Sequence, residues 1–188
     1  DKTQDSRGKE DFWIVKIDQN GTKLWDKRYG GNVEDNCNNI MALTNGGFLL
    51  AGSSRSFAGG DKTESRYAGN GDVWIVKIDQ NGTKLWDKRY GGKDGEYCSG
   101  SVATDDSGFI LFCSSSSSIA EHDLTEAGRG ANDYILLKID STGTLLWQKR
   151  YGGEFKDEGK SFITTKDGGY LLAGCLLYTS PSPRDGLL

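Results

Sequence analysis

Apolar and polar residues alternate along residues 12–18, and a second alternating run covers residues 22–29. Both runs are rich in β-branched and aromatic residues, which favours strands over helices. The intervening D-Q-N-G segment has the chemistry of a tight turn, because its glycine tolerates the left-handed backbone that a short hairpin requires. We therefore predict a β-hairpin in which Val15 lies opposite Trp25, and Trp13 shares a face with Trp25.

A second hairpin follows the first. A strand near Asn39–Thr44 leads into the turn N-G-G, and the strand Phe48–Gly52 comes after it. This last strand is apolar at consecutive positions and not only at alternate ones, which indicates that both of its faces are buried. We expect it to be a central strand of its sheet.

The whole pattern recurs with a period of 61 residues. Residues 13–31 return letter for letter as residues 74–92, and in diluted form as residues 135–153. The register holds without insertion or deletion from Asp11 to Gly174, so the repeats lie at about 11–71, 72–132 and 133–174. Internal repeats of this length indicate solenoids, propellers or similar arrays.

Each repeat combines four antiparallel strands, two tight hairpins and one long connection of about 17 residues, as in a propeller blade. A parallel β-helix would need shorter coils, and an immunoglobulin-like sandwich would not repeat at this period. We predict an all-β fold: a partial, open β-propeller with about three blades' worth of strands, in one domain over residues 1–174. Closed propellers have about 4–8 blades, so such a fragment would expose sheet edges.

The repeat motif resembles a known family. The pattern D-x-W-I-V-K-I-D-x-N-G-x-x-x-W-x-K-x-Y-G-G, followed by D-G-G-[FY]-[LI]-L-A-G, is similar to propeller-type repeats found in tandem in secreted and surface-anchored bacterial proteins. The second repeat departs from it at Phe112 and Cys113. The resemblance implies a propeller fold and an extracellular or cell-surface location.

The C-terminal segment breaks the pattern. Gly174 is followed by C-L-L-Y-T-S-P-S-P-R-D, where the earlier repeats continue with two serines. This stretch resembles the translation of a transposase-adapter sequence used in library preparation, and it holds both prolines of the chain. We interpret residues 175–188 as a non-native tail; the alternative is a genuine proline-rich tail.

Composition narrows the possible partners. The formal net charge of −4 weighs against nucleic acid, whose phosphates require a basic face. No apolar run approaches the roughly 20 residues of a membrane span. Cys37 and Cys98 hold equivalent positions in successive repeats, too far apart for a disulfide, whereas Cys98 and Cys113 flank one hairpin and could approach each other. We expect free, buried thiols.

Little in the chain indicates catalysis or a cofactor. His122 is the only histidine and is expected on a solvated loop, and no catalytic residue is predicted. The D-x-N-G turns at Asp18 and Asp79, with a weaker version at Asp140, are similar to calcium loops but lack the further carboxylates of such sites. We therefore expect no cofactor, with calcium as the open alternative. The tryptophans could stack on sugars, but their fixed positions in strands favour core packing; they are Trp13, Trp25, Trp74, Trp86 and Trp147.

The variable parts of the repeats should lie together. Successive connections in an antiparallel sheet alternate ends, so the tight hairpins share one end, and the long connections and Gly-Gly loops share the other. The second end differs between repeats and is rich in acids, which makes it the candidate binding face. The acidic residues are Glu34, Asp35, Asp94, Glu96, Asp157 and Glu158.

These observations favour a non-catalytic extracellular module that presents its loops to a protein or glycan partner, or serves as a structural stalk. The first alternative is the propeller portion of a hydrolase or lyase that acts on polysaccharide. The second is a calcium-dependent adhesin. An enzyme would be indicated by one blade with unique acids or histidines on its inner strand, and these repeats show none.

Overall fold

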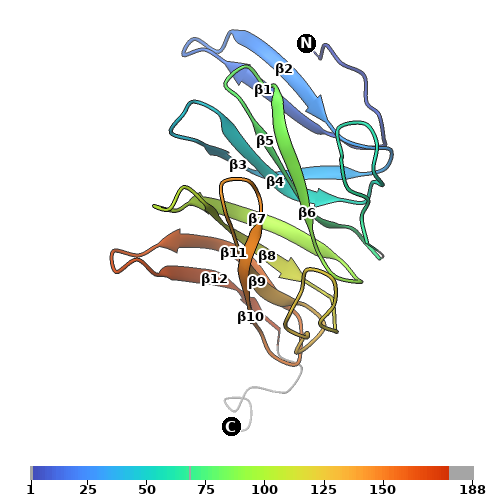
Figure 1. Cartoon of the computed structure of the whole chain (residues 1–188), viewed down its shortest axis with the longest axis vertical. Helices are drawn as coiled ribbons and strands as arrows, with labels where there is room; N and C mark the ends of the chain where they lie inside the picture. The colour runs from blue at the N-terminus through green and yellow to red at the C-terminus, as the bar shows by residue number, and fades with distance from the viewer. Residues whose placement is uncertain (1, 68, 178–188) are drawn as a thin grey trace, which may run out of the picture.

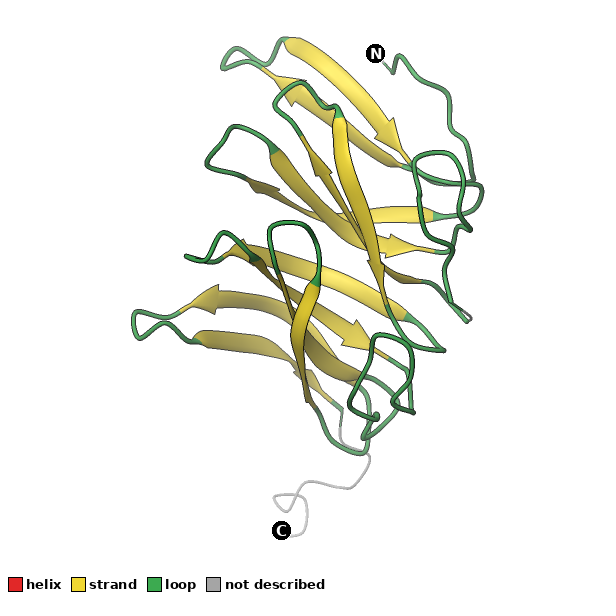
Figure 2. Cartoon of the chain, viewed as in Figure 1, coloured by secondary structure: helices red, strands yellow, loops and turns green. Residues whose placement is uncertain are grey.

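The computed structural model describes residues 2–67 and 69–177, and these residues form an all-β structure without helices (Figures 1 and 2). The all-β prediction is confirmed. No helix that could span a membrane occurs in this part of the chain. The strands are β1 (Phe12–Ile17), β2 (Lys23–Tyr29), β3 (Asp35–Ala42), β4 (Phe48–Ser54), β5 (Asp72–Ile78), β6 (Lys84–Tyr90), β7 (Glu96–Ala103), β8 (Phe109–Ser115), β9 (Asp133–Ile139), β10 (Leu145–Tyr151), β11 (Asp157–Thr164) and β12 (Tyr170–Leu176).

The predicted hairpins form, with one error of register. Lys16, and not Val15, lies opposite Trp25, because a bulge between Lys16 and Ile17 adds one residue to β2. Adjacent residues of a strand point to opposite faces, so this slip places Trp13 and Trp25 on opposite faces of the hairpin. The turn itself is as predicted, with Gly21 at a φ of 82°.

The sheets straddle the repeats. β3 to β6 form one four-stranded sheet and β7 to β10 another, while β1–β2 and β11–β12 are two-stranded. Each complete sheet thus takes the second half of one repeat and the first half of the next. The long connection 55–71 joins β4 to β5 inside one sheet, and β4 is central as predicted. The third strand begins at Asp35, earlier than the predicted start near Asn39.

The hydrophobic core lies between the sheets. One cluster joins the two complete sheets through Leu49 and Ile75 on one side and Leu111 and Leu137 on the other. Two smaller clusters pack the terminal hairpins against the opposite faces of these sheets. β4, β5, β8 and β9 are consequently buried on both faces, and each fully buried aliphatic side chain contributes about 1.5–3 kcal/mol.

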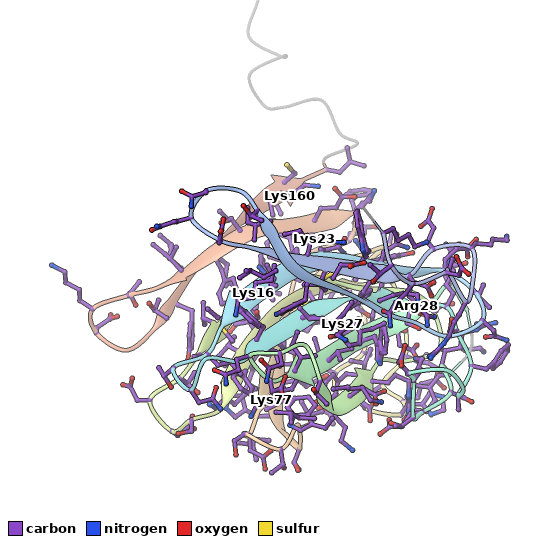
Figure 3. The ribbon with its side chains drawn as sticks, turned by 90° about the horizontal axis from the view of Figure 1, so that it is seen from above. Lys16, Lys23, Lys27, Arg28, Lys77 and Lys160 are labelled. Carbon is purple, nitrogen blue, oxygen red and sulfur yellow. The ribbon has the colours of Figure 1, made fainter. Side chains whose placement is uncertain are left out.

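The hairpin turns form a repeated contact between successive sheets. The hydroxyl group of Tyr29 donates a hydrogen bond to the carbonyl oxygen of Gly82 at 2.5 Å, and that of Tyr90 donates to Gly143 at 2.6 Å. Lys16 donates to the carbonyl oxygen of Gln80 at 3.2 Å. Figure 3 shows Lys16 nearer the turn end of the first hairpin than Arg28. Each repeat therefore binds the turn of the next.

The tryptophans do not share one environment. Trp74 is fully buried, and Trp25 and Trp86 are half-buried against the core clusters. Trp13 and Trp147, however, are 47% and 41% exposed, so the prediction of core packing is wrong for these two. Trp13 lies in the first hairpin and Trp147 on the edge strand β10, and no further sheet formed by the described residues covers them.

The four cysteines are free thiols that differ in burial. Cys98 lies directly opposite Cys113, and both are buried, free thiols as predicted. Cys37 is half-buried and Cys175 exposed. Cys175 belongs to β12, where it pairs with Glu158 as Ser53 pairs with Asn36. The rest of the predicted tail, residues 178–188, lies outside the described residues, and the adapter resemblance stays a prediction.

Candidate functional site

Two kinds of loop meet at one end of the sheets. The Gly-Gly loops, residues 30–34, 91–95 and 152–156, connect one sheet to the next, and the long loops, residues 55–71 and 116–132, connect strands within a sheet. The backbone N–H of Asp61 donates to the carbonyl oxygen of Gly30 at 3.0 Å, and that of Asp123 donates to Gly91 at 3.2 Å. We call this surface the loop face; Figure 2 shows its loops opposite the hairpin turns.

Three of the predicted binding residues lie beneath the loop face. The carboxylates of Asp35, Glu96 and Asp157 are buried. Each accepts the backbone N–H of the glycine four residues earlier, at 2.7 Å for Asp35, 3.0 Å for Glu96 and 2.6 Å for Asp157. These carboxylates hold the Gly-Gly loops in place and do not form part of the exposed surface.

The same carboxylates bind the long loops. Ser56 donates a hydrogen bond from its Oγ to Asp35 at 2.9 Å, and Ser117 donates to Glu96 at 2.7 Å. A Cβ at Gly31 would lie 2.5 Å from the Cβ of Ser56, so only glycine allows the two loops to approach this closely. One buried carboxylate therefore fixes a Gly-Gly loop and the start of a long loop together.

A second set of buried carboxylates fixes the end of each long loop. Asp72 accepts the backbone N–H of Tyr67 at 2.8 Å, and Asp133 accepts that of Arg129 at 2.9 Å. Burial raises the pKa of Asp72 to about 6. Arg150 forms a fully buried ion pair with Asp133 at 3.3 Å. Both ends of each long loop are thus held by buried acids.

A short segment in the long loops repeats as well, and sequence inspection missed it. The motif D-x-T-E occurs in both long loops. The backbone N–H of Thr63 donates to Asp87 at 2.9 Å, and that of Thr125 donates to the amide oxygen of Gln148 at 2.9 Å. Thr3, in the related segment D-K-T-Q, donates to Asp26 at 2.9 Å. Only part of each long loop is therefore variable.

The residues around these anchors change together between repeats. Asp87 accepts hydrogen bonds from the indole of Trp74 at 3.0 Å and from Lys84 at 2.7 Å. In the next repeat Gln148 takes the place of Asp87. Ile135 takes the place of Trp74, and Leu145 that of Lys84. The indole and ammonium groups that donate to Asp87 are thus absent around Gln148. A neutral amide oxygen takes the place of the carboxylate there, and it still accepts the backbone N–H of Thr125.

The other three predicted residues lie nearer the surface. Glu34 pairs with Lys9 at 3.2 Å and with Arg55 at 3.3 Å, and these cations lower its pKa. Glu158 lies between Lys156 and Lys160, and the hydrogen bonds from these lysines lower its pKa to about 2. Asp94 is half-exposed in a Gly-Gly loop. The structure does not bring the six acids into one cluster.

The two long loops meet in an aromatic stack. The rings of Tyr67 and His122 lie 3.8 Å apart at an angle of 11°, and the guanidinium of Arg89 lies 3.3 Å from the centre of the Tyr67 ring. His122 is exposed on its loop, as predicted. This stack occurs once, because the two residues come from unlike parts of successive loops, and the repeat pattern gave no signal for it.

A hollow opens beside the loop face, and most of the residues that line it are of polar types. It has a volume of about 560 Å³ and lies among β3, β7 and β11. Tyr97, Ser99 and Asn38 contribute to its wall, together with Lys156 and Lys160. The exposed ring of Tyr97 offers an apolar face among hydrogen-bonding groups, which is the combination that binds a sugar ring.

The carboxylates of the acidic turns accept hydrogen bonds from the backbone of the turns themselves. Asp18 accepts the backbone N–H groups of Asn20 and Thr22, both at 2.8 Å, and Asp79 is bonded in the same way. These carboxylates are thus part of the turns. Among residues 2–67 and 69–177, no group of three or more histidine, cysteine, aspartate or glutamate side chains is placed to hold a metal ion.

The sequence matches no model of a known protein family and no curated protein. The resemblance of the repeat motif to surface-protein propeller repeats therefore stays a prediction. The candidate site is defined by the geometry of the loop face and the adjacent hollow.

Proposed function

We propose that this chain is a non-catalytic recognition module of the β-propeller type. It acts outside the cell or at the cell surface, and its loop face binds a protein or glycan partner. One observation carries the proposal. The buried carboxylates that anchor the loops recur from repeat to repeat, whereas the exposed residues of the loops differ. Loops on a rigid scaffold are the usual place for binding residues.

The strand arrangement supports the propeller part of the proposal. Four-stranded antiparallel sheets follow one another, and each is linked to the next through a Gly-Gly loop. The first strands of successive sheets, β3, β7 and β11, lie side by side. In a propeller such strands line the central channel, so the hollow beside Tyr97 would open into that channel.

The variable surface supports recognition. Phe57 is exposed in the first long loop and Ile119 in the second, and the Tyr67–His122 stack lies where the two loops meet. The side chains of Phe57 and Ile119 take no part in the repeated anchors, and Tyr67 contributes only its backbone N–H to one of them. Exposed aromatic and apolar side chains on a fixed backbone are suited to a binding surface.

A glycan is the partner that the hollow favours. Its lining is mainly serine, asparagine and lysine side chains around one exposed tyrosine ring. Sugar rings combine an apolar face with many hydroxyl groups, so they match a lining of this kind.

The test is binding of the full chain to a panel of defined neutral and acidic polysaccharides. We expect Tyr97→Ala to weaken binding at least tenfold. Leu85→Ala, at an exposed site near the hairpin turns, should leave binding unchanged. We expect no new reducing ends or unsaturated uronates after incubation.

Three results would contradict parts of this proposal. Polysaccharide cleavage would favour the hydrolase or lyase alternative. Loss of binding on addition of a chelator would favour the calcium-dependent adhesin. Binding that survives Tyr97→Ala but is lost in Leu85→Ala would place the site at the turn end and not at the loop end.

A further inference from the structure

Two buried thiols face each other across strands β7 and β8. Cys98 and Cys113 form a directly opposed pair in this ladder. Both side chains are fully buried, and both belong to the hydrophobic cluster between the two complete sheets. Directly opposed residues of antiparallel strands have Cα atoms about 4.5–5.5 Å apart, within the range of about 4.4–6.8 Å that a disulfide requires.

The two sulfur atoms are neighbours as well. The Sγ of Cys98 donates to the carbonyl oxygen of Phe112 at 3.6 Å, so this side chain reaches the strand that carries Cys113. Burial raises the pKa of the Cys113 thiol, and a hydrogen bond with the Cys98 thiol raises it further. An S–S bond could therefore form without a rearrangement of the two strands.

The packing of the sheet does not explain a cysteine at position 113. The equivalent pairs in the other repeats are Cys37–Gly52 and Gly159–Gly174. A Cβ at either Gly52 or Gly174 would clash with a backbone carbonyl oxygen of the paired strand. Glycine therefore suits this position, and Cys113 replaces it opposite another cysteine.

The other two cysteines lie in different surroundings. Cys37 is half-buried and packs against the cluster beneath the first hairpin, whereas Cys98 belongs to the cluster between the complete sheets. Cys175 is exposed and lies opposite Glu158. Among the described cysteines, Cys98 and Cys113 are therefore the pair placed to react with each other.

We propose that Cys98 and Cys113 form an intrachain disulfide when the protein folds in an oxidising compartment. The oxidant is a small-molecule disulfide such as oxidised glutathione. One thiolate attacks it to give a mixed disulfide, and the second thiolate displaces the remaining thiol. One S–S bond forms in the protein and one breaks in the oxidant, which takes up the two electrons and two protons and leaves as two thiols.

The bond should form during folding. Thiolates are the attacking species, and burial in the folded protein disfavours them, so the folded reduced pair should react slowly. This inference rests on the extracellular location in the proposed function, because disulfides persist in such compartments. It does not depend on which partner the loop face binds.

The disulfide would join two strands beside the hollow. β7 carries the loop anchor Glu96 and the exposed ring of Tyr97 immediately before Cys98. A disulfide restricts the unfolded chain, and we expect the oxidised protein to melt about 5–10 °C above the reduced protein.

The first test is refolding of the full chain with Cys175→Ser, which removes the exposed thiol, in a buffer of reduced and oxidised glutathione. The product is unfolded without reductant, alkylated and mapped by mass spectrometry. We expect alkylation of Cys37 alone and a peptide pair that links Cys98 to Cys113. Alkylation of all three cysteines, a link from Cys37 to Cys98, or glutathione retained on Cys98 or Cys113 would overturn the proposal.

The second test compares melting temperatures after refolding in the glutathione buffer and in dithiothreitol. The Cys175→Ser chain should show the shift, and so should the same chain with Cys37→Ser as the control. Adding Cys113→Ala instead should abolish the difference between the two buffers, and a difference that persists would overturn the proposal. Circular dichroism confirms that each variant is folded.

Polysaccharide binding separates this inference from the proposed function. Binding by a chain that never forms the disulfide would contradict this inference alone. A linked Cys98–Cys113 pair in a chain that binds no polysaccharide or protein would support this inference and contradict the proposed recognition function.

Discussion

At the scale of single residues, Lys62 and Leu124 occupy the same position of the D-x-T-E segment in the two long loops. Both side chains are buried, but the ammonium of Lys62 has no hydrogen-bond partner among the described residues and lies 5.9 Å from the Trp74 ring centre. Burial lowers the pKa of Lys62 from 10.5 to about 8, although Asp72 and Asp35 act in the opposite direction. A charged lysine thus occupies a place suited to an apolar side chain.

We predict that Lys62→Leu stabilises the protein at pH 7. The lowered pKa means that the folded state disfavours the charged lysine, and we expect the variant to gain about 2 kcal/mol in free energy of unfolding. The gain is complete below pH 8, where folded and unfolded chains both carry the charge. It should shrink between pH 8 and 10.5, as the folded parent loses its proton first.

Urea unfolding of parent and variant at pH 7 and pH 10.5 checks this prediction. Lys93→Leu, at an exposed position in a Gly-Gly loop, is the matched control and should change stability little at either pH. A destabilised Lys62→Leu, or a gain that does not depend on pH, would show that the ammonium is not disfavoured by its surroundings.

At the scale of elements, the loop face depends on loops that are fixed at both ends by buried acids. Glu96 illustrates the arrangement, because it joins Gly92 in one loop to Ser117 in another. Removing this carboxylate leaves several buried donors without partners, and each such donor costs about 1–3 kcal/mol. The loops would then lose their fixed positions before the strands lose theirs.

We predict that Glu96→Ala lowers the free energy of unfolding by about 2–4 kcal/mol. Hydrogen exchange should accelerate in residues 91–95 and 116–118 before it does so in the strands. Asp94→Ala, in the same loop but half-exposed, should cost less than about 0.5 kcal/mol. Equal losses in the two variants would contradict the assignment of Glu96 as a loop anchor.

The contact between successive sheets gives a second prediction at this scale. Tyr90→Phe removes the buried hydrogen bond to Gly143 and should cost about 1 kcal/mol in free energy of unfolding. Tyr151 holds the equivalent position in the last repeat and is exposed, so Tyr151→Phe should have no measurable effect. Chemical denaturation of the two variants tests this, and an effect of Tyr151→Phe as large as that of Tyr90→Phe would argue against the inter-sheet contact.

Strand positions were predictable from the sequence because alternation and turn glycines are local signals. The division of strands among sheets was not, because a repeat of fixed period looks the same from any starting point. The register error at Trp25 came from a bulge that side-chain alternation alone does not show. The D-x-T-E anchors were missed because Thr63 and Thr125 are 62 positions apart, one more than the period of 61.

The candidate site was less predictable for a physical reason. Acidic residues in loops are usually solvated, so Asp35, Glu96 and Asp157 were expected on the surface. Backbone N–H groups in the Gly-Gly loops instead bind these carboxylates in the interior. The Tyr67–His122 stack could not be expected, because it depends on how two unlike loops fold against each other.

At the scale of the whole molecule, the burial of equivalent residues depends on which sheets lie beside them. Trp74 is buried between two sheets, whereas Trp13, which is followed by the same sequence, is exposed in a terminal hairpin. The loop face depends on neighbouring repeats as well, because some of its anchors join one repeat to the next: the backbone N–H of Thr63, in the first repeat, donates to Asp87, in the second.

The most direct test of the account is hydrogen–deuterium exchange of the full chain, alone and with the polysaccharide of the panel that it binds most tightly. We expect slower exchange in residues 30–34, 55–71, 91–95, 116–132 and 152–156, with the hairpin turns unchanged. Protection confined to residues 18–22, 79–83 and 140–144, at the opposite end of the sheets, would contradict recognition through the loop face.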